Sequence, residues 1–219
     1  MVMKKKVTSM LMCFALLFAL TACKEGKTGD ENGGVPCPIE GLEWGMTVDE
    51  CLAALSLTED DVEIDRREGE NGTNVTITAS LTGHKAYGYP VEGLGLLFYG
   101  DLNGLPVGLC NITIRFNPAP ALEELQTAVK EEVQSYLIEY PGSPLNDADS
   151  QTYITAKTIE DVDSSLRDKY LTLSIIESRK KEDFPYGRIW VGKRGGDPFI
   201  TVDNMIATVV EKASEAEKK

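Results

Sequence analysis

Histidine is almost absent from this sequence, since His84 is the only one among 219 residues. A metal site with several histidine ligands is therefore excluded, and a Ser-His-Asp or Cys-His enzyme would depend on this one residue. His84 lies in GHKAYGYP, a stretch typical of a turn, where we expect an exposed loop histidine rather than a catalytic one. The G-x-S-x-G, P-loop and HExxH motifs are absent as well. We therefore predict no catalytic, cofactor-binding or metal-binding residues.

Basic residues are scarce relative to acidic ones: 22 Lys and Arg accompany 35 Asp and Glu, a net charge of −13. This charge repels phosphate backbones, so nucleic acid is not an expected partner, and it disfavours adhesion to anionic lipid by charge alone. The acidic groups form no calcium motif, because neither the run 59–61 nor the pair Asp147 and Asp149 has EF-hand spacing. Residues 101–104, DLNG, lack the remaining ligands and are typical of a turn.

One long apolar run, Met10 to Leu20, lies near the N-terminus. It follows three lysines at positions 4–6 and has the length of the apolar region of a signal peptide, which is too short for a comfortable membrane span. The run leads directly into Leu-Thr-Ala-Cys at residues 20–23. Basic, apolar and small residues therefore precede this cysteine in the order of a secretory leader.

The sequence LTAC at 20–23 resembles the lipobox of bacterial lipoprotein precursors, in which a small residue precedes a lipidated cysteine. The resemblance covers the leader alone. It implies cleavage between Ala22 and Cys23, attachment of a diacylglyceryl group to the Cys23 sulfur and, often, acylation of the new amino terminus. The expected location is the extracytoplasmic side of the cell membrane or outer membrane, with Cys23 as the membrane anchor. An ordinary signal peptide with a chance cysteine is the alternative.

A polar, glycine-rich segment follows the cysteine: residues 24–36 read KEGKTGDENGGVP, in which Val35 is the only large apolar residue. Such a segment cannot bury enough surface to fold. We therefore predict a signal peptide over 1–22, a flexible tether over 23–38 and a globular domain over 39–215. Loss of the leader would remove three lysines and no acid, which changes the net charge from −13 to −16.

The first half of the predicted domain shows clear helical and strand periodicity. Thr47 and Glu50 have the spacing of a capping box, and apolar residues follow at the spacing of one helical face. Residues 74–81 alternate between apolar and polar side chains, as in a strand with one solvated face. The predicted elements are a helix within 41–55, a strand at 74–81, and a hairpin of strands 94–100 and 106–116 around the turn at 101–104.

The second half begins with an apolar stripe from Leu122 to Tyr140, which predicts a helix of about five turns ended by Pro141-Gly142. Residues 142–151 are expected to form a loop. The last residues, 213–219, are expected to fray. Between them we predict strands at 170–175, 186–193 and 198–202, a turn at 194–197 and a final helix capped by Asp203.

Helices and strands are segregated along the chain, which argues for an α+β fold with antiparallel sheet and helices packed on one face. Residues 39–118 and 119–215 each combine a helix with strands, so two α-β repeats or subdomains are an alternative description, although no residue motif repeats. The opening WGMTVDE, residues 44–50, resembles helix openings in small α+β modules of bacterial envelope lipoproteins, such as assembly-factor lipoproteins and β-lactamase-inhibitor-like proteins. This resemblance favours a binding module and assigns no functional residue.

Three cysteines stay in the mature chain besides Cys23, namely Cys37, Cys51 and Cys110. An odd number gives no complete disulfide framework. Cys51 and Cys110 each lie on an apolar face, and we expect buried free thiols that behave as small apolar residues. A Cys51–Cys110 or a Cys37–Cys51 disulfide is the alternative.

These observations favour a lipid-anchored envelope protein that is not an enzyme and that binds a protein or a small ligand, with the open face of the sheet as one candidate surface. The alternative is a surface hydrolase, because paired carboxylates are assembled by the fold and leave no sequence motif. The aromatic content of 7% gives no positive sign of a sugar-stacking cleft.

Overall fold

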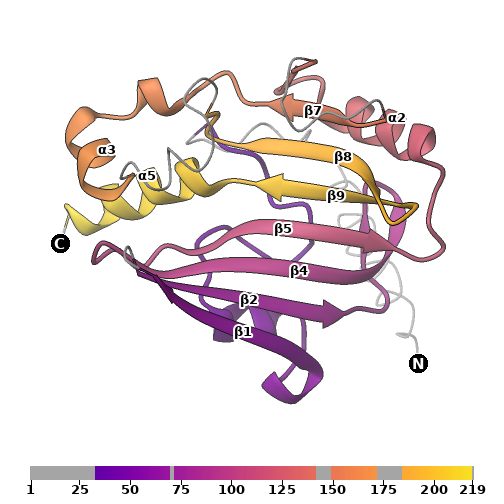
Figure 1. Ribbon diagram of the computed structural model, residues 1–219, viewed down its shortest axis with the longest axis horizontal. Helices are drawn as coiled ribbons and strands as arrows, with labels where there is room; N and C mark the ends of the chain where they lie inside the picture. Colours follow the sequence, from indigo (N-terminus) through magenta and orange to yellow (C-terminus); the bar gives the residue numbers. More distant parts are fainter. Residues whose placement is uncertain (1–32, 70–71, 142–148, 172–183, 219) are drawn as a thin grey trace, which may run out of the picture.

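A nine-stranded antiparallel sheet organises the computed structural model, which describes residues 33–69, 72–141, 149–171 and 184–218 (Figure 1). This arrangement confirms the predicted α+β fold. The strands are β1 (Val62–Gly69), β2 (Gly72–Ser80), β3 (Lys85–Ala86), β4 (Tyr89–Leu102), β5 (Gly108–Phe116), β6 (Ile138–Glu139), β7 (Gln151–Ile154), β8 (Arg188–Arg194) and β9 (Asp197–Asp203). The helices are α1 (Val48–Ala54), α2 (Leu122–Val133), α3 (Ser164–Tyr170) and α5 (Met205–Ala216), with 3₁₀ turns at Glu59–Asp61 and Ile159–Asp161.

The strand order divides the sheet into two halves. It runs β1-β2-β4-β5-β9-β8-β7-β6, with the short β3 paired to β4. Each half is an antiparallel meander that follows a helix, α1 in the first half and α2 in the second. The last strand of each half, β5 and β9, meet in the middle, where Ile112 lies opposite Val202. The two halves therefore share one continuous sheet.

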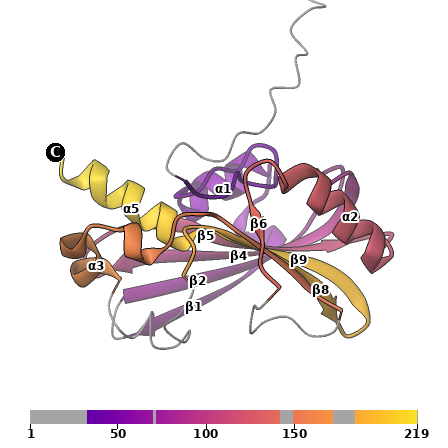
Figure 2. The same cartoon turned by 90° about the horizontal axis from the view of Figure 1, so that it is seen from above.

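Helices α1 and α2 cover one face of this sheet (Figure 2). On that face Ile77 of β2 lies opposite Leu96 of β4, and Leu96 lies opposite Ile112 of β5. All three side chains are fully buried, in one cluster with Cys51 of α1 and Leu125 of α2. Apolar residues at every second position of each strand thus form the main core.

A second, smaller core lies where α3 and α5 pack against the turn between β4 and β5. Leu105 from this turn and Cys110 from β5 share it with Tyr170 of α3 and Val209 of α5. Figure 1 shows both helices beside the same end of the sheet. The chain segment between β7 and β8, which contains α3, therefore adds a packing layer that the first half does not have.

Several predicted elements are confirmed. Thr47 and Glu50 form a capping box at the start of α1. In β2 the residues Val75, Ile77 and Ala79 are buried while the threonines between them are exposed. β4 and β5 form the predicted hairpin, and in its turn the Gly104 amide donates to Asp101 Oδ1 at 2.6 Å. β8 and β9 also form an antiparallel pair, as their predicted strands and turn suggest.

The predicted five-turn helix is too long, because α2 ends at Val133. The amides of Tyr136 and Leu137 both donate to the Val133 carbonyl, at 3.0 and 2.9 Å, so the chain leaves the helix in a tight turn. The Tyr140 amide then donates to the Thr152 carbonyl at 2.8 Å, next to the β6–β7 pairing. Leu137 lies in this turn and is still buried, so the apolar stripe continues beyond the end of the helix.

Several elements escaped prediction, among them β1, β7 and α3. β1 carries the charged sequence VEIDRREG and lies at an edge of the sheet, where charged side chains are tolerated. β7 begins in the expected loop at 142–151 and continues beyond it. Tyr170 ends α3 instead of starting a strand, and Asp163 caps that helix by accepting from the Ser165 amide at 2.8 Å. Residues 172–175 of the predicted strand lie outside the described residues.

The C-terminal helix begins where it was predicted, but Asn204 rather than Asp203 holds the N-cap position. Asp203 still accepts from the Met205 amide at 3.2 Å, and it also accepts from the Arg188 guanidinium at 2.8 Å. The expectation that residues 213–219 fray is wrong for most of that stretch, because α5 continues to Ala216. Ala213 is fully buried, which explains why the helix persists.

Packing also begins earlier than the predicted domain start at residue 39. Val35 is fully buried, and its amide donates to Asn204 Oδ1 at 2.7 Å. The Trp44 indole N–H donates to the Val35 carbonyl. Asn204 itself is 1% exposed, so this contact fastens the N-terminal segment to the junction of β9 and α5.

The predicted leader, Cys23 and the first part of the tether lie outside the described residues. No helix within the described ranges is both long and apolar enough to cross a membrane.

Candidate functional site

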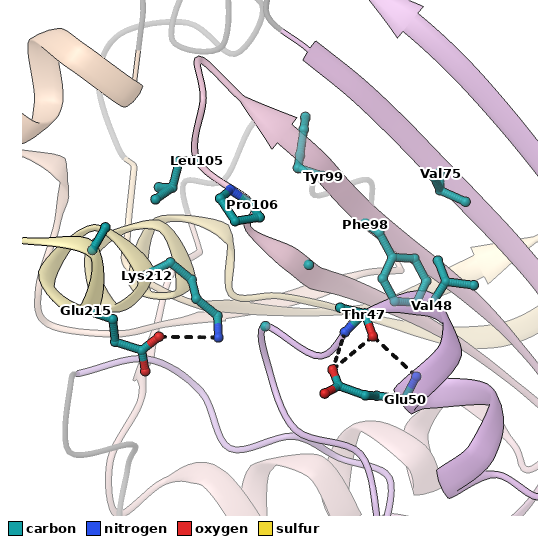
Figure 3. Close-up of a pocket in the computed structure, with 14 residues that line it drawn as sticks. Thr47, Val48, Glu50, Val75, Phe98, Tyr99, Leu105, Pro106, Lys212 and Glu215 are labelled. Carbon is teal, nitrogen blue, oxygen red and sulfur yellow. Dashed lines mark hydrogen bonds and ion pairs between the residues drawn. The ribbon is translucent and has the colours of Figure 1, made fainter. Parts of the chain in front are cut away.

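A cleft of about 500 Å³ lies between the start of α1, the β4–β5 turn and the C-terminal turns of α5 (Figure 3). We call it the α1–α5 cleft. Its walls come from segments that are far apart in the sequence, including Thr47, Val48, Phe98, Pro106, Lys212 and Glu215.

Two glycines allow the backbone to form the floor of this cleft. The Gly45 amide donates to the Leu109 carbonyl and the Leu109 amide donates to the Met46 carbonyl, both at 2.8 Å. Gly108 has φ +79°, and a Cβ there would lie 2.3 Å from the Gly45 carbonyl oxygen. A larger residue at Gly108 would therefore separate the two segments.

Side chains of both cores lie directly beneath the cleft and line its apolar wall. Val75 and Phe98 lie in the main core, and Leu105 lies in the smaller one. Their exposed fractions are only 7%, 1% and 2%. The wall is thus a shallow, rigid surface of packed side chains, and the hollow in front of it comes from the separation of α1 and α5.

The Glu50 carboxylate lies at the rim, where it completes the cap of α1. It accepts from the Thr47 amide at 2.8 Å and from the Thr47 hydroxyl at 2.9 Å, while the Glu50 amide donates to the same hydroxyl at 3.3 Å. The backbone hydrogen bond from Thr47, then the hydroxyl and the charge of Lys212, hold the pKa of Glu50 below its ordinary value. Glu50 is therefore a carboxylate at neutral pH.

Lys212 extends from α5 along the opposite rim. Its side chain lies over Gly45, where a Cβ would be 2.5 Å from Lys212 Cε. The ammonium forms an ion pair with Glu215 at 3.6 Å, and Figure 3 shows both groups at the mouth of the cleft. The rim thus combines one cation with two anions around an apolar wall.

This arrangement is suited to binding and offers little for acid–base chemistry. A general acid at neutral pH needs a raised carboxyl pKa, whereas the pKa of Glu50 is lowered. Glu215 is held in its ion pair with Lys212. Within the described part of the chain, no three His, Cys, Asp or Glu side chains are grouped as metal ligands.

The three described cysteines do not meet in a disulfide. Cys37, Cys51 and Cys110 are all in the thiol form, with Cys51 in the main core and Cys110 in the smaller one. The Cys110 thiol donates to the Leu97 carbonyl at 3.4 Å. Burial, followed by the nearby Cys37 and Glu50, raises the pKa of Cys51 to about 12, so this thiol is unreactive at neutral pH. Both cysteines lie on apolar faces as predicted, but these faces belong to different cores.

His84 lies in the chain between β2 and β3 and is half-buried. Its carbonyl accepts from the Val91 amide at 3.0 Å, which closes the β3–β4 hairpin. Within the described residues its imidazole has no hydrogen-bonded nucleophile or carboxylate partner. A role in the turn therefore accounts for its position.

The two α5 residues at the cleft, Lys212 and Glu215, were missed from the sequence. Their i,i+3 spacing was the available signal, since it pairs opposite charges on one helical face. Only the fold shows that this face lies beside the α1 cap. Comparisons with family models, curated proteins and solved structures give no match for this chain.

Proposed function

We propose that this protein is a lipid-anchored binding or assembly module on the extracytoplasmic side of a bacterial membrane, and that a partner protein occupies its α1–α5 cleft. The single observation that carries the binding role is the cleft itself. It presents an apolar wall whose charged rim groups already have partners within the protein, because Thr47 donates to the Glu50 carboxylate and Lys212 pairs with Glu215. A partner can bury apolar side chains there without leaving an unpaired charge.

The anchoring half of the proposal rests on the leader and on the LTAC sequence that ends at Cys23. A diacylglyceryl group supplies two acyl chains, which give stable anchoring where a single chain is marginal. The acidic charge of the domain adds no attraction to anionic lipid, so the anchor is the expected source of membrane attachment.

The length of chain before the domain limits where the cleft would act. Gly33 is ten residues after Cys23, so the connection spans at most about 35 Å when fully extended. Val35 is fastened by Trp44 and Asn204, and Trp44 adjoins Gly45 of the cleft. The tether would therefore join the domain beside the cleft, which favours a partner at the same membrane.

Anchoring is tested with Cys23→Ala in the full chain. We expect this variant to lose incorporation of radiolabelled fatty acid and to accumulate as an unprocessed precursor or leave the membrane fraction. Cys37→Ala is the matched control, because its thiol lies outside the LTAC sequence. Normal labelling, size and fractionation of Cys23→Ala would show that the lipoprotein assignment is wrong.

The cleft is tested by site-specific photo-crosslinking in cells. A photoreactive residue at Pro106, which is exposed and lines the cleft, should yield a discrete crosslinked product. The same residue at Glu131, exposed on α2, should not. Lys212→Glu should abolish the product, whereas Lys130→Glu should not, although Lys130 is also paired with a glutamate, at 3.3 Å. Equal products from both positions, or none from Pro106, would contradict a specific cleft partner.

A further inference from the structure

The sheet face opposite α1 and α2 carries a second hollow, distinct from the α1–α5 cleft. Figure 2 shows this face on the far side of the sheet from these helices. A groove of about 570 Å³ crosses β2, β4, β5 and β9, which we call the open-face groove. Its lining includes Thr78, Glu92, Gly95, Thr113, Arg115 and Phe199.

Arg115 is exceptional among the arginines whose side chains are described. Each of the others forms an ion pair with a carboxylate: Arg66 with Glu59, Arg67 with Asp65, Arg167 with Glu160 and Arg188 with Asp203. Arg115 has no carboxylate within ion-pair distance among the described residues, although the protein is strongly acidic. Its five N–H donors are therefore available to a ligand.

A glycine lets the Arg115 guanidinium lie against the sheet. Gly93 on β4 is directly opposite Arg115 on β5. A Cβ at Gly93 would be 2.9 Å from Arg115 Nη2 and equally close to the Ala79 carbonyl oxygen. Any larger residue would displace the guanidinium from this position. The groove thus holds its cation against its floor, while the side chain stays exposed to solvent on the open side.

Aromatic and hydroxyl groups flank the guanidinium. Phe199 on β9 lies opposite Arg115 and packs edge-to-face on Trp190, with ring centroids 4.7 Å apart. In the neighbouring row, the hydroxyls of Thr113 and Thr201 are 3.2 Å apart and share a hydrogen bond. The Phe199 ring and the Thr113–Thr201 hydroxyl pair therefore lie on the same part of the sheet face as Arg115.

We propose that the open-face groove binds a small monocarboxylate with an apolar ring or chain, its carboxylate on Arg115 and its apolar part against Phe199. A guanidinium matches a carboxylate in two parallel hydrogen bonds, and such bonds are short and strong. Glu92 and Asp197 also line the groove, and their charges disfavour ligands with several negative groups. The site therefore selects one carboxylate over phosphate esters and polyanions.

This proposal is independent of the cleft and of its partner protein, so either can fail alone. The test uses the full chain in detergent micelles and benzoate as the probe, with empty micelles subtracted. Ligand-observed NMR should show saturable binding with a dissociation constant of about 1 mM, as expected for so small a ligand. Benzamide, which has the same shape without the charge, should bind at least about tenfold more weakly.

Variants separate a specific site from general adsorption. Arg115→Gln should weaken benzoate binding by about tenfold or more, and Arg115→Lys should weaken it as well, because lysine keeps the charge but loses the fork. Arg66→Gln removes an equal charge from β1 and should leave binding unchanged. Binding that is absent in the native protein, or equal in Arg115→Gln and Arg66→Gln, would overturn the proposal.

Discussion

The two halves of the sheet share one order of elements, a helix followed by an antiparallel meander, but they differ in the lengths of their strands and connections. In the first half, β1, β2, β4 and β5 have 8, 9, 14 and 9 residues, and the longest connection between them, residues 81–88, contains the short β3. In the second half, β6 and β7 have only 2 and 4 residues, and the segment that carries α3 separates β7 from β8. The first half supplies most of the main core. The second half adds the smaller core and one rim of the cleft.

This difference shows how one sheet can carry two hollows, for each of which we propose a binding role. The helices of both halves close one face and leave the opposite face of β2, β4, β5 and β9 available for the open-face groove. Helix α5, which follows the second meander, faces the α1 cap across the cleft. If the halves unfold as one cooperative unit, a substitution at their junction should lower the stability of both.

The largest effect is expected at the junction. Ile112 on β5 is fully buried and lies opposite Val202 on β9. Ile112→Ala should lower the free energy of unfolding by about 2–5 kcal/mol, because it removes buried methyl groups and leaves a cavity. The transitions followed by fluorescence of Trp44 in the first half and Trp190 in the second should shift together in chemical denaturation. A shift seen by Trp44 alone would show that the halves unfold separately.

A matched control for this change is Ile138→Ala, since Ile138 on β6 is 55% exposed. It should change the free energy of unfolding by no more than about 0.5 kcal/mol.

The next largest effect concerns the contact between the second half and the start of the domain. Asn204→Ala leaves the buried Val35 amide without its acceptor, which should cost about 1–3 kcal/mol in the free energy of unfolding. Hydrogen exchange should accelerate at Val35 and Trp44. Ser135→Ala, a change at an exposed position, is the control. Unchanged exchange in Asn204→Ala would mean that this contact does not hold the N-terminal segment.

Helix capping in the first half gives a smaller effect. Thr47→Ala removes the hydroxyl that accepts from the Glu50 amide and should destabilise the protein by about 1 kcal/mol, measured by thermal denaturation. Asp163→Ala removes the corresponding cap of α3 in the second half. If the sheet couples the halves, both variants should lower the same single transition. A separate, earlier transition in Asp163→Ala alone would identify α3 as an independent unit.

The Glu50 carboxylate should make the first half sensitive to acid. Its pKa is lower in the folded protein than its ordinary value of 4.5, so its stabilising effect is complete above that value and is lost as pH falls through the lower folded pKa. The difference in stability between the native protein and Glu50→Ala should be constant near neutral pH and should shrink in acid. A difference that grows in acid would contradict this sign.

The smallest effect is expected at the surface ion pairs. Lys130 on α2 and Glu139 on β6 are 3.3 Å apart in the second half, with side chains 55% and 46% exposed. Lys130→Gln should change stability by less than about 1 kcal/mol, and this effect should fall further in high salt. Arg66→Gln, which breaks a comparable pair in the first half, should behave alike. A large loss in only one of them would show that the halves depend differently on surface charge.

The sequence by itself determined those features whose cause is local. The capping box of α1, the alternation in β2 and the β4–β5 hairpin all depend on residues close together in the chain. Local patterns failed where contacts between distant residues determine the conformation. β1 is charged yet pairs with β2. The chain after Val133 keeps apolar residues at helical spacing, yet it is not helical, and the Tyr140 amide donates to the Thr152 carbonyl. The leader and Cys23 also carry a local signal, and the anchor they predict stays a prediction.

Only the tertiary structure decided which surfaces come together. Cys51 and Cys110 both lie on apolar faces, yet Cys51 on α1 packs in the main core and Cys110 packs with α5 in the smaller one. Lys212 lies across the cleft from the α1 cap, and the Arg115 guanidinium lies over Gly93, because the fold brings together segments that are distant in the chain. The physical reason is that local propensity fixes the conformation of each segment, whereas burial of apolar surface selects which segments become neighbours.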